Sequence, residues 1–156
     1  MQSYSLEIND FCCSEYTLIS VHTPLNDYKL AYLLNKYLGI KLTRANYDLD
    51  FNNNNNKSSY PVFEYLDKEL DNNWFLITNV FKEKRKTDLT TLFEESDVKT
   101  YLIPEKKKVD YFLKIEGDFE YEYIIKTLEK IKYIPQIATS YTVETDTLKS
   151  KENLIF

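Results

Sequence analysis

The chain reads, from residue 103 to residue 115, Ile103-Pro104-Glu105-Lys106-Lys107-Lys108-Val109-Asp110-Tyr111-Phe112-Leu113-Lys114-Ile115. The second part of this stretch alternates in polarity, with apolar side chains on one face, Asp110 and Lys114 on the other, and Phe112 as the exception. A period of two is typical of a half-buried β-strand. The first part, a proline followed by charged residues, indicates a turn. With 98–103 as a second strand, we expect a hairpin joined by a five-residue turn.

Further strands are expected outward from this hairpin. The charged run 82–86 interrupts the apolar strand pattern that precedes it. The five asparagines of 52–56 are interpreted as a mobile loop tip. The segment 74–81 is almost continuously apolar, which favours a central strand covered on both faces or a contact with a second copy. The expected strands cover 4–9, 16–22, 42–51, 60–66, 74–81 and 137–143.

Two segments have the period of amphipathic helices. We expect the first to begin at Thr23-Pro24 and to end at Gly39, because proline is favoured in the first turn and glycine at the end of a helix. The second is expected to begin at Asp118 and to stop before Pro135. Its predicted buried stripe consists of Tyr121, Ile124, Ile125, Leu128 and Ile131.

The order of these elements predicts a two-layer α+β sandwich, with a mainly antiparallel sheet and two helices on one face. A ferredoxin-like topology with inserted strands is the specific expectation. Residues 1–147 are expected to form a single domain, followed by a C-terminal tail at 148–156. The sheet face opposite the helices is expected to be solvated, covered by loops or used for dimerisation, and the many tyrosines make it a candidate binding surface.

The composition excludes several classes of function. The chain has 156 residues and a net charge of −5, which argues against general nucleic-acid binding. Its two glycines are too few for a phosphate-cradling loop or a dinucleotide fingerprint. The first seven residues resemble no targeting signal, and no apolar run approaches the ~20 residues of a membrane span. We therefore expect a cytoplasmic protein with no membrane segment.

The sequence offers little catalytic chemistry. His22 is the one histidine, and the adjacent Cys12 and Cys13 are poorly spaced for a disulfide, a redox pair or a zinc site. No spacing assembles a nucleophile, a base and an anion-stabilising loop. We predict no catalytic residue, no metal site and no cofactor.

Two groups of residues remain as candidates for binding. Glu105 and Asp110, with Lys114 as a counter-charge, could form an acidic site at the predicted hairpin, although the same charges could simply solvate the turn. The polar tail ends in Leu154, Ile155 and Phe156, which would be a liability if exposed. We expect these three residues to dock on their own domain or on a partner subunit.

The stretch Ile103-Pro104-Glu105, three lysines, then Val109-Asp110-Tyr111, resembles the motif of the bacterial IPExxxVDY family, and the tail at 148–156 is similar to the ends of its members. The resemblance covers most of the chain. It implies no activity, cofactor or catalytic residue.

Three functions remain as hypotheses. The first is a non-enzymatic domain for protein interaction or assembly, including self-association as a homodimer. The second is a regulatory domain that binds a small molecule between helices and sheet or across a dimer. The third is contact with RNA through the lysine clusters at 82–86 and 106–108, with tyrosines as stacking platforms.

Overall fold

The computed structural model describes residues 16–86 and 95–156. The predictions for Cys12, Cys13 and a strand at 4–9 lie outside these residues. The helices and strands are β1 (Tyr16–His22), α1 (Asp27–Leu38), β2 (Thr43–Asn53), β3 (Asn56–Asp67), β4 (Asn72–Thr78), β5 (Val80–Lys86), β6 (Glu95–Tyr101), β7 (Tyr111–Glu116), α2 (Tyr121–Lys132) and β8 (Thr139–Val143). None of the helices in this part of the chain is long and apolar enough to cross a membrane.

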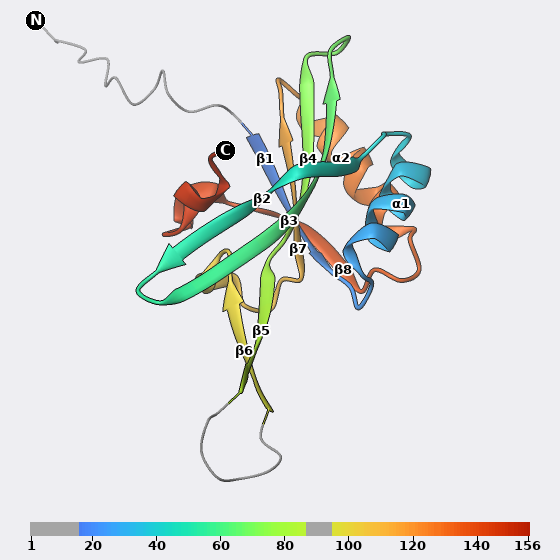
Figure 1. The fold of residues 1–156 in the computed structure, drawn as a ribbon. Helices are drawn as coiled ribbons and strands as arrows, with labels where there is room; N and C mark the ends of the chain where they lie inside the picture. Colours follow the sequence, from blue (N-terminus) through green and yellow to red (C-terminus); the bar gives the residue numbers. More distant parts are fainter. Residues whose placement is uncertain (1–15, 87–94) are drawn as a thin grey trace, which may run out of the picture.

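The main sheet has six strands in the order β2-β3-β4-β7-β1-β8, and every neighbouring pair is antiparallel (Figure 1). Within it, β8-β1-β7-β4 has the ferredoxin-like order, with α1 after β1 and α2 after β7. The hairpin β2-β3 is inserted before β4, and the hairpin β5-β6 is inserted between β4 and β7. The predicted α+β fold is confirmed.

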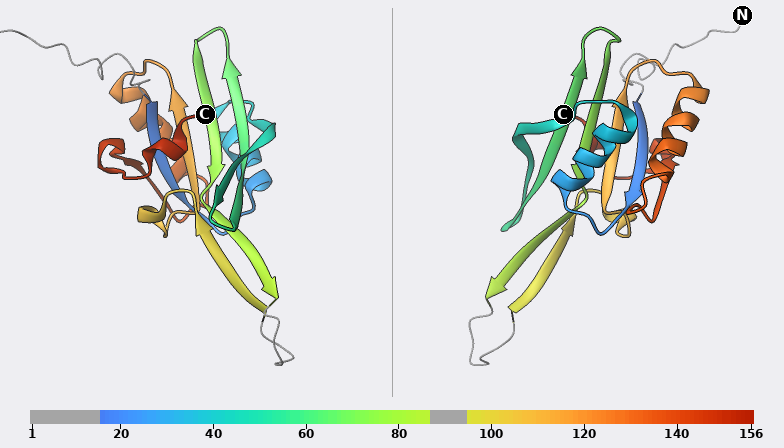
Figure 2. Two further views of the ribbon diagram at one scale, coloured as in Figure 1. Left: turned by 60° about the vertical axis from the view of Figure 1, so that its left-hand side comes forward. Right: turned by 90° about the vertical axis from the view of Figure 1, so that its right-hand side faces the viewer.

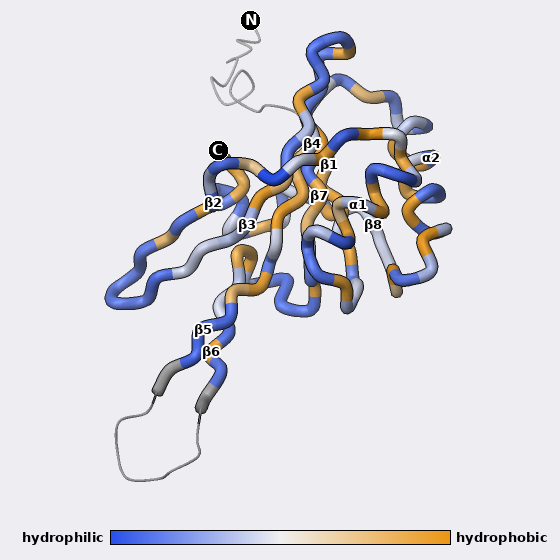
Figure 3. The backbone as a smooth tube through the Cα atoms, turned by 45° about the vertical axis from the view of Figure 1, so that its right-hand side comes forward, coloured by the Kyte–Doolittle hydropathy of each residue, from blue (hydrophilic) through white to orange (hydrophobic). Residues whose placement is uncertain are grey.

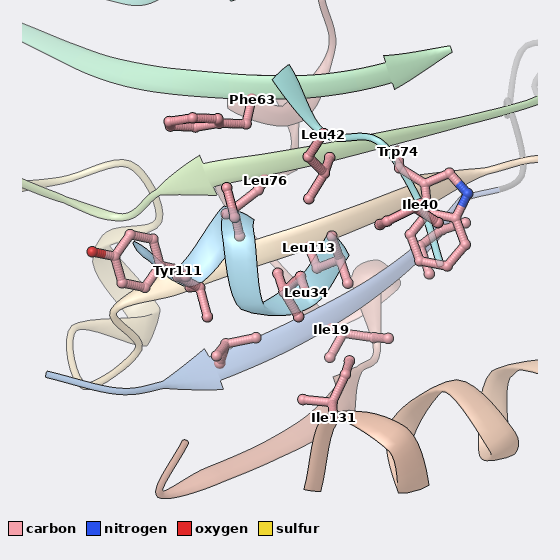
Figure 4. Packing of buried hydrophobic residues seen from close by; sticks show 14 of the residues in the cluster. Ile19, Leu34, Ile40, Leu42, Phe63, Trp74, Leu76, Tyr111, Leu113 and Ile131 are labelled. Atoms are coloured by element: carbon pink, nitrogen blue, oxygen red, sulfur yellow. The ribbon is translucent and has the colours of Figure 1, made fainter. Parts of the chain in front are cut away.

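Both helices cover one face of the main sheet and bury the larger apolar cluster. Leu34 of α1 and Ile131 of α2 point toward Ile19, Leu113 and other strand residues (Figure 4). Gly39 ends α1 in the left-handed region, at a φ of 69°, as expected. The predicted start of α1 at Thr23-Pro24 is wrong, since the helix begins at Asp27.

The second helix also begins later than predicted. It starts at Tyr121 with Glu120 as its N-cap, two residues beyond Asp118, the expected N-cap. Tyr121 is therefore not part of the buried stripe: it is 78% exposed, because the first turn of α2 extends past the edge of the apolar cluster.

The opposite face of the sheet is covered by loops and the C-terminal segment. Leu102, Ile103 and Val109 from the connection between β6 and β7 pack there, together with Leu148 and Leu154. Figure 1 shows the C-terminal segment on the side of the sheet away from the helices. This second layer explains why Phe112 and Lys114 of β7 are both buried. It also explains why β4 is apolar on both faces, as its sequence indicated.

The predicted hairpin between 98–103 and β7 is wrong. Instead β6 pairs with β5, from Val80 opposite Tyr101 to Lys86 opposite Glu95, while β7 pairs with β4 and β1. Strands β5 and β6 form a two-stranded ribbon, here called the arm, that projects from the body (Figures 1 and 2). Its outer part is hydrophilic (Figure 3). The charged run at 82–86 is therefore part of a strand and not a break.

The asparagine run also differs from its expected form. Asn53 pairs with Asn56, and the two residues between them, Asn54 and Asn55, have positive φ angles of 40° and 76°. Asparagine tolerates this conformation, which two-residue hairpin turns of type I′ require. Asn54 and Asn55 are thus the tight turn of the β2-β3 hairpin, and the other three asparagines of the tract belong to its strands.

Candidate functional site

The three predicted binding residues each have their own partners in the structure. The carboxylate of Glu105 accepts hydrogen bonds from the Ser150 backbone N–H at 2.7 Å and from the Ser150 hydroxyl at 3.0 Å. Asp110 accepts a bond of 2.9 Å from the Thr23 N–H. Lys114 pairs with Glu116, with a distance of 2.7 Å between Nζ and Oε1. Glu105 and Lys114 contact the C-terminal segment, and Asp110 contacts the loop before α1.

Asp110 and Tyr111 fix this loop to the start of β7. Besides the bond to Thr23, the backbone N–H of Asp110 donates to the Val21 carbonyl at 3.3 Å. The Tyr111 hydroxyl donates to the Leu25 carbonyl at 2.6 Å. Burial, with a further contribution from the charges of Asp27 and Asp110, raises the pKa of Tyr111 to about 12. Tyr111 therefore remains a hydrogen-bond donor throughout the physiological pH range.

The connection between β6 and β7 is organised by Asn79, a fully buried residue that the sequence did not single out. Its side-chain Nδ2 donates to the Lys106 carbonyl at 2.9 Å and to the Val109 carbonyl at 2.8 Å, and its Oδ1 accepts from the Ile103 N–H at 2.9 Å. Its backbone bonds to Asp110 and Leu102. One side chain thus satisfies three backbone groups of the IPExxxVDY-like stretch.

Lys114 links the sheet to the C-terminal segment. Its ammonium donates to the Leu154 carbonyl at 2.7 Å and lies 4.5 Å from the centre of the Phe156 ring and 4.9 Å from that of Tyr16. Phe156 also makes an edge contact with Phe75, at 5.1 Å between ring centres.

The tail residues differ in burial. Leu154 is fully buried, Phe156 is 40% exposed and Ile155 is 75% exposed. Leu154 and Phe156 pack on the chain's own sheet, while Ile155 points to solvent.

Glu105 makes the docking of the C-terminal segment sensitive to acid. Desolvation raises the pKa of its carboxyl, but the hydrogen bonds from Ser150, Lys149 and its own N–H together lower it below the ordinary value of 4.5. A lowered folded pKa means that the contact stabilises the fold above pH 4.5 and is lost as the pH falls through the folded pKa.

We expect Glu105→Gln to lower the thermal midpoint at neutral pH by about 2–4 °C, since an exposed bond of this kind contributes roughly 1 kcal/mol. The difference from wild type should close as the pH falls below the ordinary glutamate range. Thermal unfolding of both proteins across a pH series measures it. A gap that stays constant down to acid pH would contradict the assignment.

A polar hollow of about 360 Å³ lies where the arm leaves the body. Its lining includes Thr23 and Asn26 before α1, the arm residues Lys82 and Lys99, Lys107 of the turn, and Asp110. It is the one place in the described structure where a predicted site residue, Asp110, meets several cations. The sequence could not reveal it, because the pairing of Lys82 with Lys99 depends on the arm.

Outside this hollow, His22 contacts a neighbouring strand, and the described residues contain no metal-ligand cluster. The Nε2 atom of His22 lies 3.1 Å from the hydroxyl oxygen of Tyr141, which is on the neighbouring strand β8. Within 16–86 and 95–156, no group of three or more His, Cys, Asp or Glu side chains could hold a metal ion. No protein-family model matches the chain, and no curated protein matches it.

Proposed function

We propose that the chain is a non-enzymatic assembly domain, and that its arm mediates association with a second copy of the chain. The observation that carries this proposal is the arm itself: β5 and β6 pair only with each other, and neither has a second partner among the described strands. An isolated two-stranded ribbon is marginally stable in water, and open edges readily pair with another chain. Packing against a partner would stabilise the ribbon.

Charge favours a second copy as the partner. The two arm strands contain five basic residues (Lys82, Lys84, Arg85, Lys86 and Lys99) and three acidic ones (Glu83, Glu95 and Asp97), a net charge of +2, whereas the whole chain carries −5. Residues 87–94, which join the two strands, add Asp88 and Glu94, so residues 80–101 together are neutral and the rest of the chain carries the −5. The basic residues of the two arm strands are electrostatically complementary to the acidic rest of another copy.

The roles of the motif residues support a function without catalysis. Glu105, Asp110 and Tyr111 are all engaged in bonds that hold the loops and the C-terminal segment in place. Such roles suit a motif that preserves a fold. On the same motif we propose that the chain belongs to the IPExxxVDY family of bacterial proteins, and its charged composition supports a cytoplasmic location.

Shortening the arm tests the assembly proposal. Replacing residues 82–99 by Asn-Gly joins Phe81 to Thr100, which lie directly opposite each other, through a two-residue turn suited to a hairpin. We expect wild type to show a sedimentation coefficient that rises with protein concentration and falls with added salt. The shortened variant should sediment as a monomer and retain the circular dichroism spectrum of the folded body.

A control at the other hairpin makes the result decisive. Replacing Asn54-Asn55 by Asn-Gly alters the other hairpin turn without removing the arm, and it should leave self-association unchanged. A wild-type protein that stays monomeric at every concentration, or a shortened variant that associates as strongly as wild type, would refute the role of the arm in assembly.

A further inference from the structure

We propose that the hollow at the base of the arm is a binding site for a small phosphorylated molecule, with Lys82, Lys99 and Lys107 as the groups that bind its phosphates. The site shares Lys82 and Lys99 with the arm but does not depend on the assembly role of the arm. It lies between the loop before α1, the first residues of the arm and the turn that contains Lys107.

The first argument is the arrangement of the cations. Lys82 and Lys99 are directly opposite each other in the arm, and both line the hollow. Like charges in this position repel each other and destabilise the strand pair. An anion held between the two ammonium groups would attract both of them and so relieve their repulsion. Binding of an anion would therefore stabilise this part of the arm.

The second argument is that these cations have no carboxylate partner within 16–86 and 95–156. The ion pairs found among the described residues include none formed by Lys82, Lys99 or Lys107. Lys107 instead lies 5.9 Å from the centre of the Tyr101 ring, which also lines the hollow. The one carboxylate of the lining, Asp110, is bonded to the Thr23 N–H. Three cations against one carboxylate leave the lining with a net charge of +2.

The N-terminus of α1 adds to the positive charge around the hollow. Asn26, the N-cap of the helix, lines the hollow and makes no capping bond through its side chain. The positive end of the helix dipole favours an anion at this position, although Asp27 in the first turn offsets part of it. The dipole assists the lysines and would not make a site without them.

Size and polarity define the class of ligand. A volume of about 360 Å³ is at the lower end of the range for small-molecule sites. Lysines bind phosphate as point charges, and three of them around one hollow suit a group with several negative charges. Tyr101 provides an aromatic surface, and Asp110 an acceptor for a ligand hydroxyl. A small molecule carrying two phosphates fits these features.

The test uses inorganic pyrophosphate as the probe, titrated into the full chain by calorimetry at low ionic strength. We expect saturable binding at one site. Lys99→Glu should weaken it by roughly tenfold or more, because it replaces a favourable charge by a repulsive one. The same substitution places a carboxylate opposite Lys82, so the folded protein should be no less stable than wild type in urea. A loss of binding therefore cannot be explained by unfolding.

The matched control is Lys126→Glu, which makes the same charge change at an exposed position on α2 and should bind pyrophosphate as wild type does. Absence of saturable binding to wild type, or equal weakening by both substitutions, would overturn the proposal. So would a single-stranded RNA that binds more tightly than pyrophosphate and is equally sensitive to Lys99→Glu, since the lysines would then contact nucleic acid.

Discussion

Asn79→Ala is expected to destabilise the protein by about 4 kcal/mol, the largest effect of any substitution considered. The change leaves three backbone groups without their partner: the carbonyls of Lys106 and Val109 and the N–H of Ile103. Each buried group left unsatisfied costs roughly 1–3 kcal/mol, and the exposure of Lys106 to water lowers the total. Equilibrium unfolding in urea measures the free energy, and the thermal midpoint should fall by about 8–16 °C.

A control at another asparagine separates this effect from the general cost of the substitution. Asn46 lies on β2 and is exposed, so Asn46→Ala should change the free energy of unfolding by less than about 0.5 kcal/mol. If Asn79→Ala cost no more than this control, the bonds of Asn79 would contribute nothing net to stability, and the connection between β6 and β7 would be held by its apolar contacts alone.

The bonds of Asn79 also show what the sequence could and could not predict. Strands β1 and β4, the end of α1 and the α+β class follow from local periodicity, since alternation and turn residues are visible within a few positions. Asn79 bonds to residues 24 and 30 positions away, and nothing local marks such a contact. The expected strand 74–81 included Asn79, whereas in the structure this residue separates β4 from β5.

The wrong pairing of β7 has a related cause. Two strand-like segments separated by a short charged turn favour a hairpin, because the chain closure is local. In the structure the turn is instead a 3₁₀ helix at Pro104–Lys106, and β7 returns to the centre of the main sheet between β4 and β1. At that position the two helices cover one face of β7, and the β6-β7 connection together with the C-terminal segment covers the other, which a solvent-facing hairpin would not allow.

The candidate site was predictable only in part. Asp110 was singled out and does line the hollow at the base of the arm, but its partners there could not be inferred. Lys82 and Lys99 belong to segments that the sequence assigned to a break and to a separate strand. These two lysines lie opposite each other because of the register of β5 against β6, which local sequence patterns do not determine.

Lys114→Met is expected to release the C-terminal segment and to destabilise the protein by about 2–3 kcal/mol. Lys114 is 2% exposed, and its ammonium holds the Leu154 carbonyl and Glu116 while lying against the Phe156 ring. Methionine keeps the length and apolar stem of the side chain, so the loss reports the ammonium and not a cavity. Removing one partner of a buried ion pair costs roughly 3–5 kcal/mol, but Glu116 is partly exposed and can be solvated, which lowers the cost.

Hydrogen exchange of the backbone amides distinguishes release of the segment from general weakening of the fold. In Lys114→Met the amides of residues 148–156 should exchange much faster than in wild type, while those of β1 and β4 keep the order of protection that they have in wild type. Lys126→Met, the same substitution at an exposed site on α2, should leave both groups unchanged. Equal protection of the segment in Lys114→Met and wild type would mean that Leu148 and Leu154 hold it by apolar packing without help from the charge, because both side chains remain buried against the sheet.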